Sequence, residues 1–273
     1  MLNKQCKSRS NYKNLGGDRK GGIMLLHVVY ERTFQLFILT LLGINLVYAQ
    51  QNESDNPFIG GGIAILDLVA EDPREYVAMQ KQNSEVFETL GADLSGVCTA
   101  VSGNDVAGEM QVYALFTSLG AAFNMWDIML TSNQIRNIQN EFNSSRTLVG
   151  NQTWQIVKGL EGEIFEESFA TRVVDVNPTN PEAYVQAIRN MEKAYHENGY
   201  DRVQFDIHQP IASGTAGFYK VIVLAPSLKM LGNVFGALAS EAWAQEAYSL
   251  VTASRTELLS DKAYRCEPVY SGQ

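Results

Sequence analysis

Apolar positions recur along the chain with two different periods. In residues 203–207 every second position is apolar, which is typical of a strand with one buried face. In the segment just before it, large apolar side chains recur three and four positions apart, at Tyr184, Ile188, Met191 and Tyr195. Pro181 suits the first turn of a helix and Gly199 suits its end. The pattern therefore predicts a helix followed by a strand.

The chain also contains a tandem duplication. Six spaced positions recur at an offset of 108: Asp67, Pro73, Tyr76, Val77, Gly91 and Asp93 return as Asp175, Pro181, Tyr184, Val185, Gly199 and Asp201. A later block, Ser145-Arg146-Thr147, returns at an offset of 109 as Ser254-Arg255-Thr256. We place the one-residue insertion in the glycine-rich stretch 213–217, where a hairpin turn would absorb it. This register makes Cys98 the counterpart of Asp206.

Each copy predicts the element order β-α-β-β-α-β in about 100 residues, the ferredoxin-like unit. The first copy has expected strands at 62–70, 94–101, 111–116 and 147–157, with helices at 73–90 and from Ser118 into the 130s. The second has expected strands at 170–176, 202–209, 218–225 and within 256–266, with helices at 181–198 and from Ser227. The resulting division is a signal peptide (1–49), a polar linker (50–59), repeat 1 (60–157), an acidic linker (158–168) and repeat 2 (169–273).

Two consecutive units of this size resemble a single-chain version of the dimeric α/β-barrel superfamily. That superfamily includes small monooxygenases, stress-responsive barrel proteins, muconolactone isomerase-like enzymes and haem-binding chlorite dismutase relatives. The resemblance covers residues 60–268 and rests on the repeat and its element order, because no catalytic motif of a member family accompanies it. It implies an α+β fold in which two four-stranded sheets close a barrel with helices outside and ligands bound within or beside it. A fused pair could be a monomer.

Strand alternation predicts which side chains would face the barrel interior. The polar members of that set are Asp67, Gln111, Tyr113, Asp175, Gln204, Asp206, His208 and Lys220. Buried charges are rare unless they are paired or functional. Two explanations stay open: these residues bind a ligand in a polar lumen, or they form structural Asp–Lys and Asp–His pairs or sit at the open barrel ends.

Asp206 and His208 lie two apart on one strand face, so the carboxylate could orient the imidazole as an acid–base pair requires. Lys220 would then hold an anionic group. One function class is therefore a small-molecule binder or enzyme using acid–base or oxygen-dependent chemistry, and the other is a non-catalytic scaffold. Haem is a third option, with His208 as axial ligand. No metal site is expected, because His and Cys do not stand at ligand spacing, and the cofactor is unknown.

Basic residues concentrate at the N-terminus, seven of them within the first 49 positions, ahead of the apolar run 36–47. Val47 and Ala49 then give a small-residue cleavage pattern, and twelve residues are too few to span a bilayer of about 30 Å. We expect cleavage before Gln50 and an exported, soluble protein, periplasmic or extracellular; Met24 is an alternative start to Met1. The whole chain has a net charge of −9, and without the first 49 residues it has 14 − 28 = −14, which disfavours nucleic-acid and membrane binding.

Cys98 and Cys266 are the cysteines that follow the predicted signal peptide. In the barrel that the resemblance implies, the second strand of one unit lies beside the fourth strand of the other, which could bring these residues together. An oxidising compartment would then favour a disulfide. Two separately buried thiols are the other possibility.

Overall fold

The computed structural model describes residues 56–161, 165, 167–214 and 217–272. The predicted signal peptide and most of the polar linker 50–59 lie outside them. Repeat 1 contains β1 (Gly62–Ala70), α2 (Pro73–Gln82), α3 (Glu85–Thr89), β2 (Leu94–Ser102), β3 (Glu109–Phe116), α4 (Leu119–Thr131), α5 (Asn133–Phe142) and β4 (Arg146–Lys158). Repeat 2 contains β5 (Phe169–Pro178), α6 (Pro181–Glu197), β6 (Gln204–Ala212), β7 (Tyr219–Ala225), α7 (Leu228–Ser240), α8 (Ala242–Ala253) and β8 (Arg255–Ser271).

The strands form one closed antiparallel barrel in the order β1-β3-β2-β8-β5-β7-β6-β4. Within each repeat the neighbours follow the ferredoxin-like order, fourth strand, first, third, second. The repeats meet at two seams, where β2 pairs with β8 and β4 pairs with β6. The predicted α+β fold, a pseudo-dimeric barrel made from two ferredoxin-like repeats, is confirmed.

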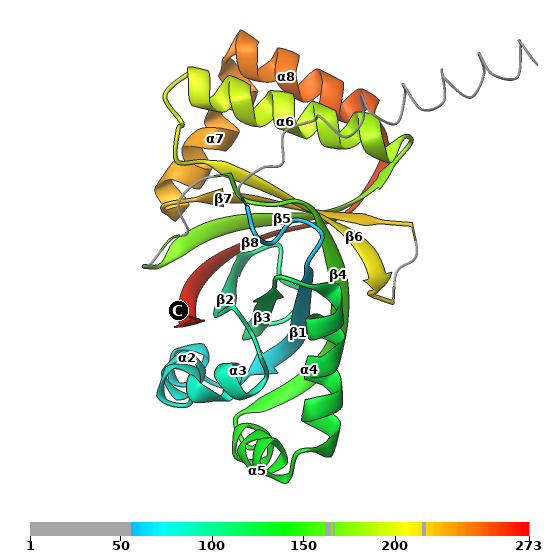
Figure 1. Cartoon of the computed structure of the whole chain (residues 1–273). Coiled ribbons are helices and arrows are strands. Elements are labelled where there is room, and N and C mark those ends of the chain that lie inside the picture. The colour runs from blue at the N-terminus through cyan, green and yellow to red at the C-terminus, as the bar shows by residue number, and fades with distance from the viewer. Residues whose placement is uncertain (1–55, 162–164, 166, 215–216, 273) are drawn as a thin grey trace, which may run out of the picture. The chain divides into compact units, whose positions relative to one another are not determined.

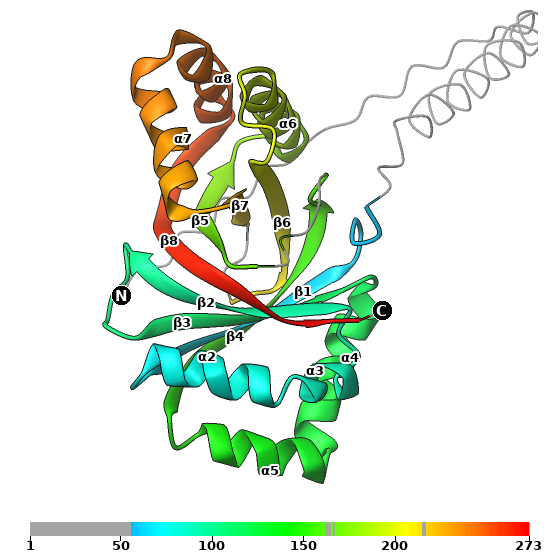
Figure 2. The ribbon, with the colours of Figure 1, turned by 90° about the vertical axis from the view of Figure 1, so that its left-hand side faces the viewer.

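The helices cover the outside of the barrel in two layers on opposite sides. Figures 1 and 2 show α6, α7 and α8 against the sheet of repeat 2, and α2 to α5 against the sheet of repeat 1. The interfaces are continuous apolar clusters to which Val221 and Val223 contribute in one layer and Val112 and Ala114 in the other. Every second residue of β3 and β7 therefore faces a helix layer, and the alternate residues face the lumen.

Helix boundaries follow capping side chains. Asp72, Ser118, Asn180 and Ser227 each accept a hydrogen bond from a backbone N–H in the first turn of α2, α4, α6 and α7. The helix predicted over 73–90 is wrong in one respect. It ends at Gln82 because the Asn83 side chain donates to the carbonyl of Met79, and a short α3 follows. In repeat 2 the equivalent α6 is uninterrupted.

Strand register corrects the repeat alignment. Asp67 pairs with Gln111, which pairs with Cys98, whereas Asp175 pairs with Lys220, which pairs with His208. Cys98 is therefore the structural counterpart of His208 and not of Asp206. Repeat 2 gains two residues between Gly199 and the start of β6, and its β6–β7 hairpin is one residue shorter than the β2–β3 hairpin. The insertion expected in 213–217 was misplaced.

Several strands extend further than the sequence pattern indicated, and two of these extensions matter for the site. β8 continues to Ser271 instead of ending near Cys266. β4 includes Lys158, which the sequence assigned to the acidic linker and which is fully buried. Among the described residues, no helix has the length and apolar character needed to cross a membrane.

Candidate functional site in the barrel lumen

The lumen contains two apolar clusters and a set of polar side chains from neighbouring strands. One cluster is built around Ile63, Leu115 and Ile156, and the other around Val173 and Leu224. Residues directly opposite each other in adjacent strands share a face of the sheet. His208 lies opposite Ile156 of β4 and Lys220 of β7, so all three point into the lumen, as was predicted for His208 and Lys220.

His208 and Asp206 form a buried pair on β6. The imidazole Nε2 lies 2.8 Å from Asp206 Oδ2, and the His208 side chain is fully buried. Because a carboxylate only accepts hydrogen bonds, the proton of neutral His208 belongs on Nε2. Its Nδ1 and the second oxygen of Asp206, Oδ1, are buried and have no hydrogen-bond partner among the described residues. The pair thus offers two unused buried acceptor positions.

Lys220 is held beside this pair by a carboxylate and an aromatic ring. Its Nζ lies 2.8 Å from Asp175 Oδ1 and 4.8 Å from the centre of the Trp154 ring. Ser260 donates to the other oxygen of Asp175 at 2.7 Å. Lys220 is therefore charge-balanced by Asp175, as the structural explanation of the sequence analysis required.

Asp67 occupies the equivalent place in repeat 1 but has amide partners instead of a cation. Gln111 donates to Oδ1 at 2.8 Å and Gln152 donates to Oδ2 at 2.6 Å. Trp154 Nε1 donates to Gln152 Oε1 at 2.9 Å, so this indole touches the networks of both carboxylates. The lumen thus joins the two repeats through one polar network.

Gln204 and Tyr113 also lie inside the barrel. Gln204 is buried opposite Leu224, and Tyr113 packs against both lumen clusters. Burial raises the pKa of the Tyr113 phenol above its usual range. Its ring needs Gly96, because a Cβ at that position would lie 2.4 Å from the hydroxyl oxygen. Tyr113 is therefore a packed, un-ionised wall residue.

The structure also joins the two cysteines. Cys98 and Cys266 face each other across the β2–β8 seam, with Cα atoms 3.9 Å apart and their sulfurs bonded. The disulfide alternative is confirmed, and the pair closes a loop of 168 residues. Both cysteines belong to the lumen cluster around Val173.

Four charged residues that form ion pairs in the barrel or between it and α6 were absent from the predicted site. Lys158 forms a buried ion pair with Glu192 of α6 at 2.7 Å and donates to the carbonyl of Phe205 at the same distance. Glu109 accepts from Lys262 at 2.7 Å. No sequence signal marked Lys158 or Glu192, because the sequence around Lys158 is typical of a linker and a charged residue such as Glu192 is common on a helix surface.

The described lumen residues offer few ligand groups for a metal ion or for haem iron. The described part of the chain has no cluster of three or more His, Cys, Asp or Glu arranged to hold a metal ion. An axial bond from His208 would have to use Nδ1, because Asp206 occupies Nε2. The arrangement can orient an imidazole, accept a proton at Nδ1 and present a charge-balanced ammonium beside it.

No protein-family model matches the sequence, and no curated protein matches it either. Solved structures with a similar arrangement include an anthrone oxidase-like protein (12% identity, 81% of this chain and 97% of that chain, TM-score 0.47). Chlorite dismutase from Candidatus Nitrospira defluvii is another (11% identity, 80% and 93%, TM-score 0.49). By its strand order and its two repeats, the chain has the fold of the dimeric α/β-barrel superfamily, without assignment to a specific family within it.

Proposed function

We propose that this protein binds a small organic molecule in the barrel lumen, and that His208 takes a proton from this molecule. The observation that carries the proposal is the unpartnered, buried Nδ1 of His208, next to the unpartnered Oδ1 of Asp206. A buried polar atom without a partner costs about 1–3 kcal/mol, so such atoms call for an explanation, such as a bound ligand, a catalytic role or an ordered water. Two of them on one hydrogen-bonded pair favour a ligand.

Asp206 would act as the positioning residue and His208 as the base. The Nε2–H···Oδ2 bond fixes the tautomer and leaves the Nδ1 lone pair to take a proton from a bound O–H, N–H or C–H group. Once His208 is protonated, the adjacent carboxylate stabilises the imidazolium. The Lys220 ammonium contacts the Asp175 carboxylate and the face of the Trp154 ring. An ammonium has three N–H groups, so one remains to donate to a ligand oxygen. Acid–base chemistry therefore needs only residues already in place.

Export is a second part of the proposal. The basic stretch and apolar run before Gln50 support a cleaved secretory signal. The disulfide between Cys98 and Cys266 supports an oxidising compartment independently of that signal, since structural disulfides are rare in the cytosol. The intact mass of the secreted protein tests this, with Gln50 as the expected first residue. Retention of residues 36–47 would contradict it.

The competing function is a non-catalytic scaffold. It is favoured by the Asp175–Lys220–Ser260 network and by the apolar clusters that pack inside the barrel. On that account the lumen is a core and the outer surface binds partners. The two functions differ in what His208 does, so they can be separated by experiment.

The test is mass spectrometry of small molecules retained by the purified protein and by its His208→Gln variant. The proposal expects a compound that the wild type retains and His208→Gln loses. His196→Gln is the matched control, because His196 lies on α6 outside the barrel, where its Nε2 contacts the carbonyl of Val203. Equal retention by all three proteins, or no retained compound with unchanged turnover of every candidate substrate, would favour the scaffold.

Nitrogen-15 NMR of the histidine rings gives a readout that needs no ligand. We expect His208 in the Nε2–H form with an unprotonated Nδ1, since Asp206 accepts from Nε2. Asp206→Asn should weaken this tautomer preference. A His208 ring protonated at Nδ1 in the wild type would contradict the assigned base.

A further inference from the structure

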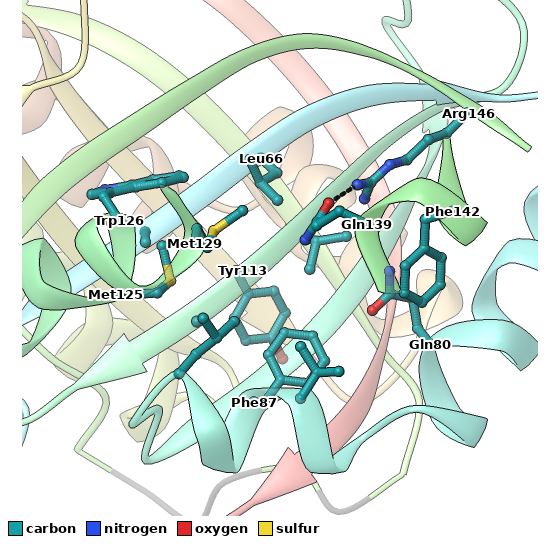
Figure 3. A pocket seen from close by; sticks show the side chains of 15 residues that line it. Leu66, Gln80, Phe87, Tyr113, Met125, Trp126, Met129, Gln139, Phe142 and Arg146 are labelled. Atoms are coloured by element: carbon teal, nitrogen blue, oxygen red, sulfur yellow. Dashed lines mark hydrogen bonds between the residues drawn. The ribbon is translucent and has the colours of Figure 1, made fainter. Parts of the chain in front are cut away.

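A small cavity lies outside the barrel, between the sheet of repeat 1 and helices α2 to α5. It has a volume of about 30 Å³, enough for a few non-hydrogen atoms. Figure 3 shows that it has two ends: Arg146, Gln139 and Gln80 lie at one, and Trp126, Met125 and Met129 at the other. None of these six residues belongs to the lumen site, although Tyr113, which the lumen clusters contact, also lines the cavity.

Arg146 is a buried cation with no counter-charge. It is 6% exposed, and its guanidinium donates to the Tyr76 hydroxyl at 2.6 Å and to Gln139 Oε1. Both acceptors are neutral, and no carboxylate of the described residues forms an ion pair with it. Its Nε is buried and has no partner among those residues. Two aromatic rings contact the guanidinium, whose carbon lies 5.8 Å from the centre of the Tyr76 ring and 5.4 Å from that of Phe142. Burying a charge without an opposite charge is costly, so among the described residues the pocket holds a positive charge that no carboxylate neutralises, with one N–H unused.

Tyr76 adds a second unused donor beside Arg146. The phenol oxygen accepts from Arg146 Nη1 and from Gln80 Nε2, at 2.6 and 2.8 Å. Burial raises the pKa of Tyr76, and the positive charge of Arg146 lowers it by less, so the phenol keeps its proton. No described residue accepts that O–H. The polar cluster thus has donors in excess of acceptors, which is the composition of an anion site.

Repeat 2 has a much larger side chain at one position of the cavity wall. Strand register pairs Ala64 with Ala114 and Arg172 with Val223, so Ala64 is the counterpart of Arg172. The Arg172 guanidinium lies over the Phe235 ring at 5.0 Å and is paired with Asp261. In repeat 1 the small Ala64 side chain lines the cavity at the position where repeat 2 has Arg172. The two copies therefore differ in side-chain size at one wall of this cavity.

We propose that this cavity of repeat 1 binds a small monovalent anion at Arg146, with the carboxylate of a short-chain acid as the best fit. A planar carboxylate can accept from the guanidinium in the geometry that arginine favours. The apolar end formed by Trp126, Met125 and Met129 suits a methyl or ethyl group. A divalent anion such as sulfate would bring more charge than one arginine neutralises.

Thermal unfolding in a series of sodium salts at constant ionic strength tests the site. Formate, acetate and propionate should raise the unfolding midpoint along a saturating curve, by on the order of 5 °C at saturation, because a ligand that binds only the folded state stabilises it. Chloride should act more weakly and sulfate should show no saturable effect. Saturable quenching of Trp126 fluorescence by nitrate gives a second readout at the cavity wall.

Three variants separate the site from general salt effects. Arg146→Gln should lose the saturable response, and Ala64→Val, which fills the cavity and leaves Arg146 in place, should lose it as well. Arg255→Gln changes the equivalent arginine of repeat 2, which donates to Tyr248 at 2.9 Å, and should keep it. A response unchanged in Arg146→Gln and Ala64→Val would overturn the proposal. A stronger response to chloride than to any carboxylate would overturn the assigned ligand class.

Discussion

Removing the disulfide between Cys98 and Cys266 should lower the free energy of unfolding by about 5 kcal/mol. The bond joins residues that are 168 positions apart, so it restricts most of the unfolded chain. The chain-entropy relation gives about 17 cal/mol/K for a loop of that length, or about 5 kcal/mol at room temperature. The bond also closes the β2–β8 seam, where the first and last parts of the described chain meet.

The variant for this measurement is Cys98→Ala combined with Cys266→Ala. Urea unfolding of the variant and of the oxidised wild type gives the difference in free energy, and the slope of the transition should rise because the unfolded variant exposes more surface. The thermal midpoint should fall by about 10–20 °C, at about 2–4 °C per kcal/mol for a unit of this size. Wild-type protein treated with a reductant should behave like the variant, which is the control for lost packing around the two side chains.

Two results would refute the reasoning. Two free thiols in the denatured, unreduced protein would show that the bond does not form. A loss below about 1 kcal/mol with the bond intact in the wild type would show that the chain-entropy account does not apply, because the unfolded state is already compact.

Other changes probe different parts of the barrel. Lys158→Met should cost about 3–5 kcal/mol in urea unfolding, because it leaves Glu192 buried without its partner, and adding Glu192→Leu should restore most of that loss; equal loss in both would contradict it. Burial raises the pKa of Tyr113 and of Tyr264 above the usual value of about 10, so the folded state holds these protons more tightly than the unfolded state; the free energy of unfolding should fall as pH rises above about 10, and phenolate absorbance of the two should appear only on unfolding. Residues 50–160 expressed alone should self-associate, because Ile63 and Ile65 of the inner sheet face lose their cover; a stable monomer by light scattering would show that the repeats are independent.

The sequence predicted the features that follow from periodicity. Alternation along β6 and β7 identified which side chains face the helices, and it correctly turned Asp206, His208 and Lys220 toward the lumen. The repeat identified the architecture, because a ferredoxin-like half leaves one sheet face uncovered and two halves can cover each other. These are properties of single strands and of the chain as a whole.

Features that depend on the register between strands were harder to predict from the sequence. A loop can gain two residues before one strand and lose one after it without changing any apolar pattern, so the alignment made Cys98 the counterpart of Asp206 when the structure makes it the counterpart of His208. Pairing partners of Asp67 were missed for the same reason, since Gln152 lies 85 positions away and nothing local marks it. The sequence contains differences between the copies, such as Ala64 in one and Arg172 in the other. Only the strand register shows that these two residues occupy equivalent positions.

Fusion of the two repeats explains how one barrel can hold both a disulfide and a histidine pair. A barrel made from two identical chains would carry the same residues at both seams. In this chain the equivalent seam positions differ, with Cys98 opposite Cys266 at one and His208 opposite Ile156 at the other. One seam is therefore closed covalently, and the other is held by backbone pairing next to His208, whose Nδ1 has no partner among the described residues. Under the proposed function, substitutions at the His208 seam should alter ligand binding, and those at the disulfide seam should alter stability.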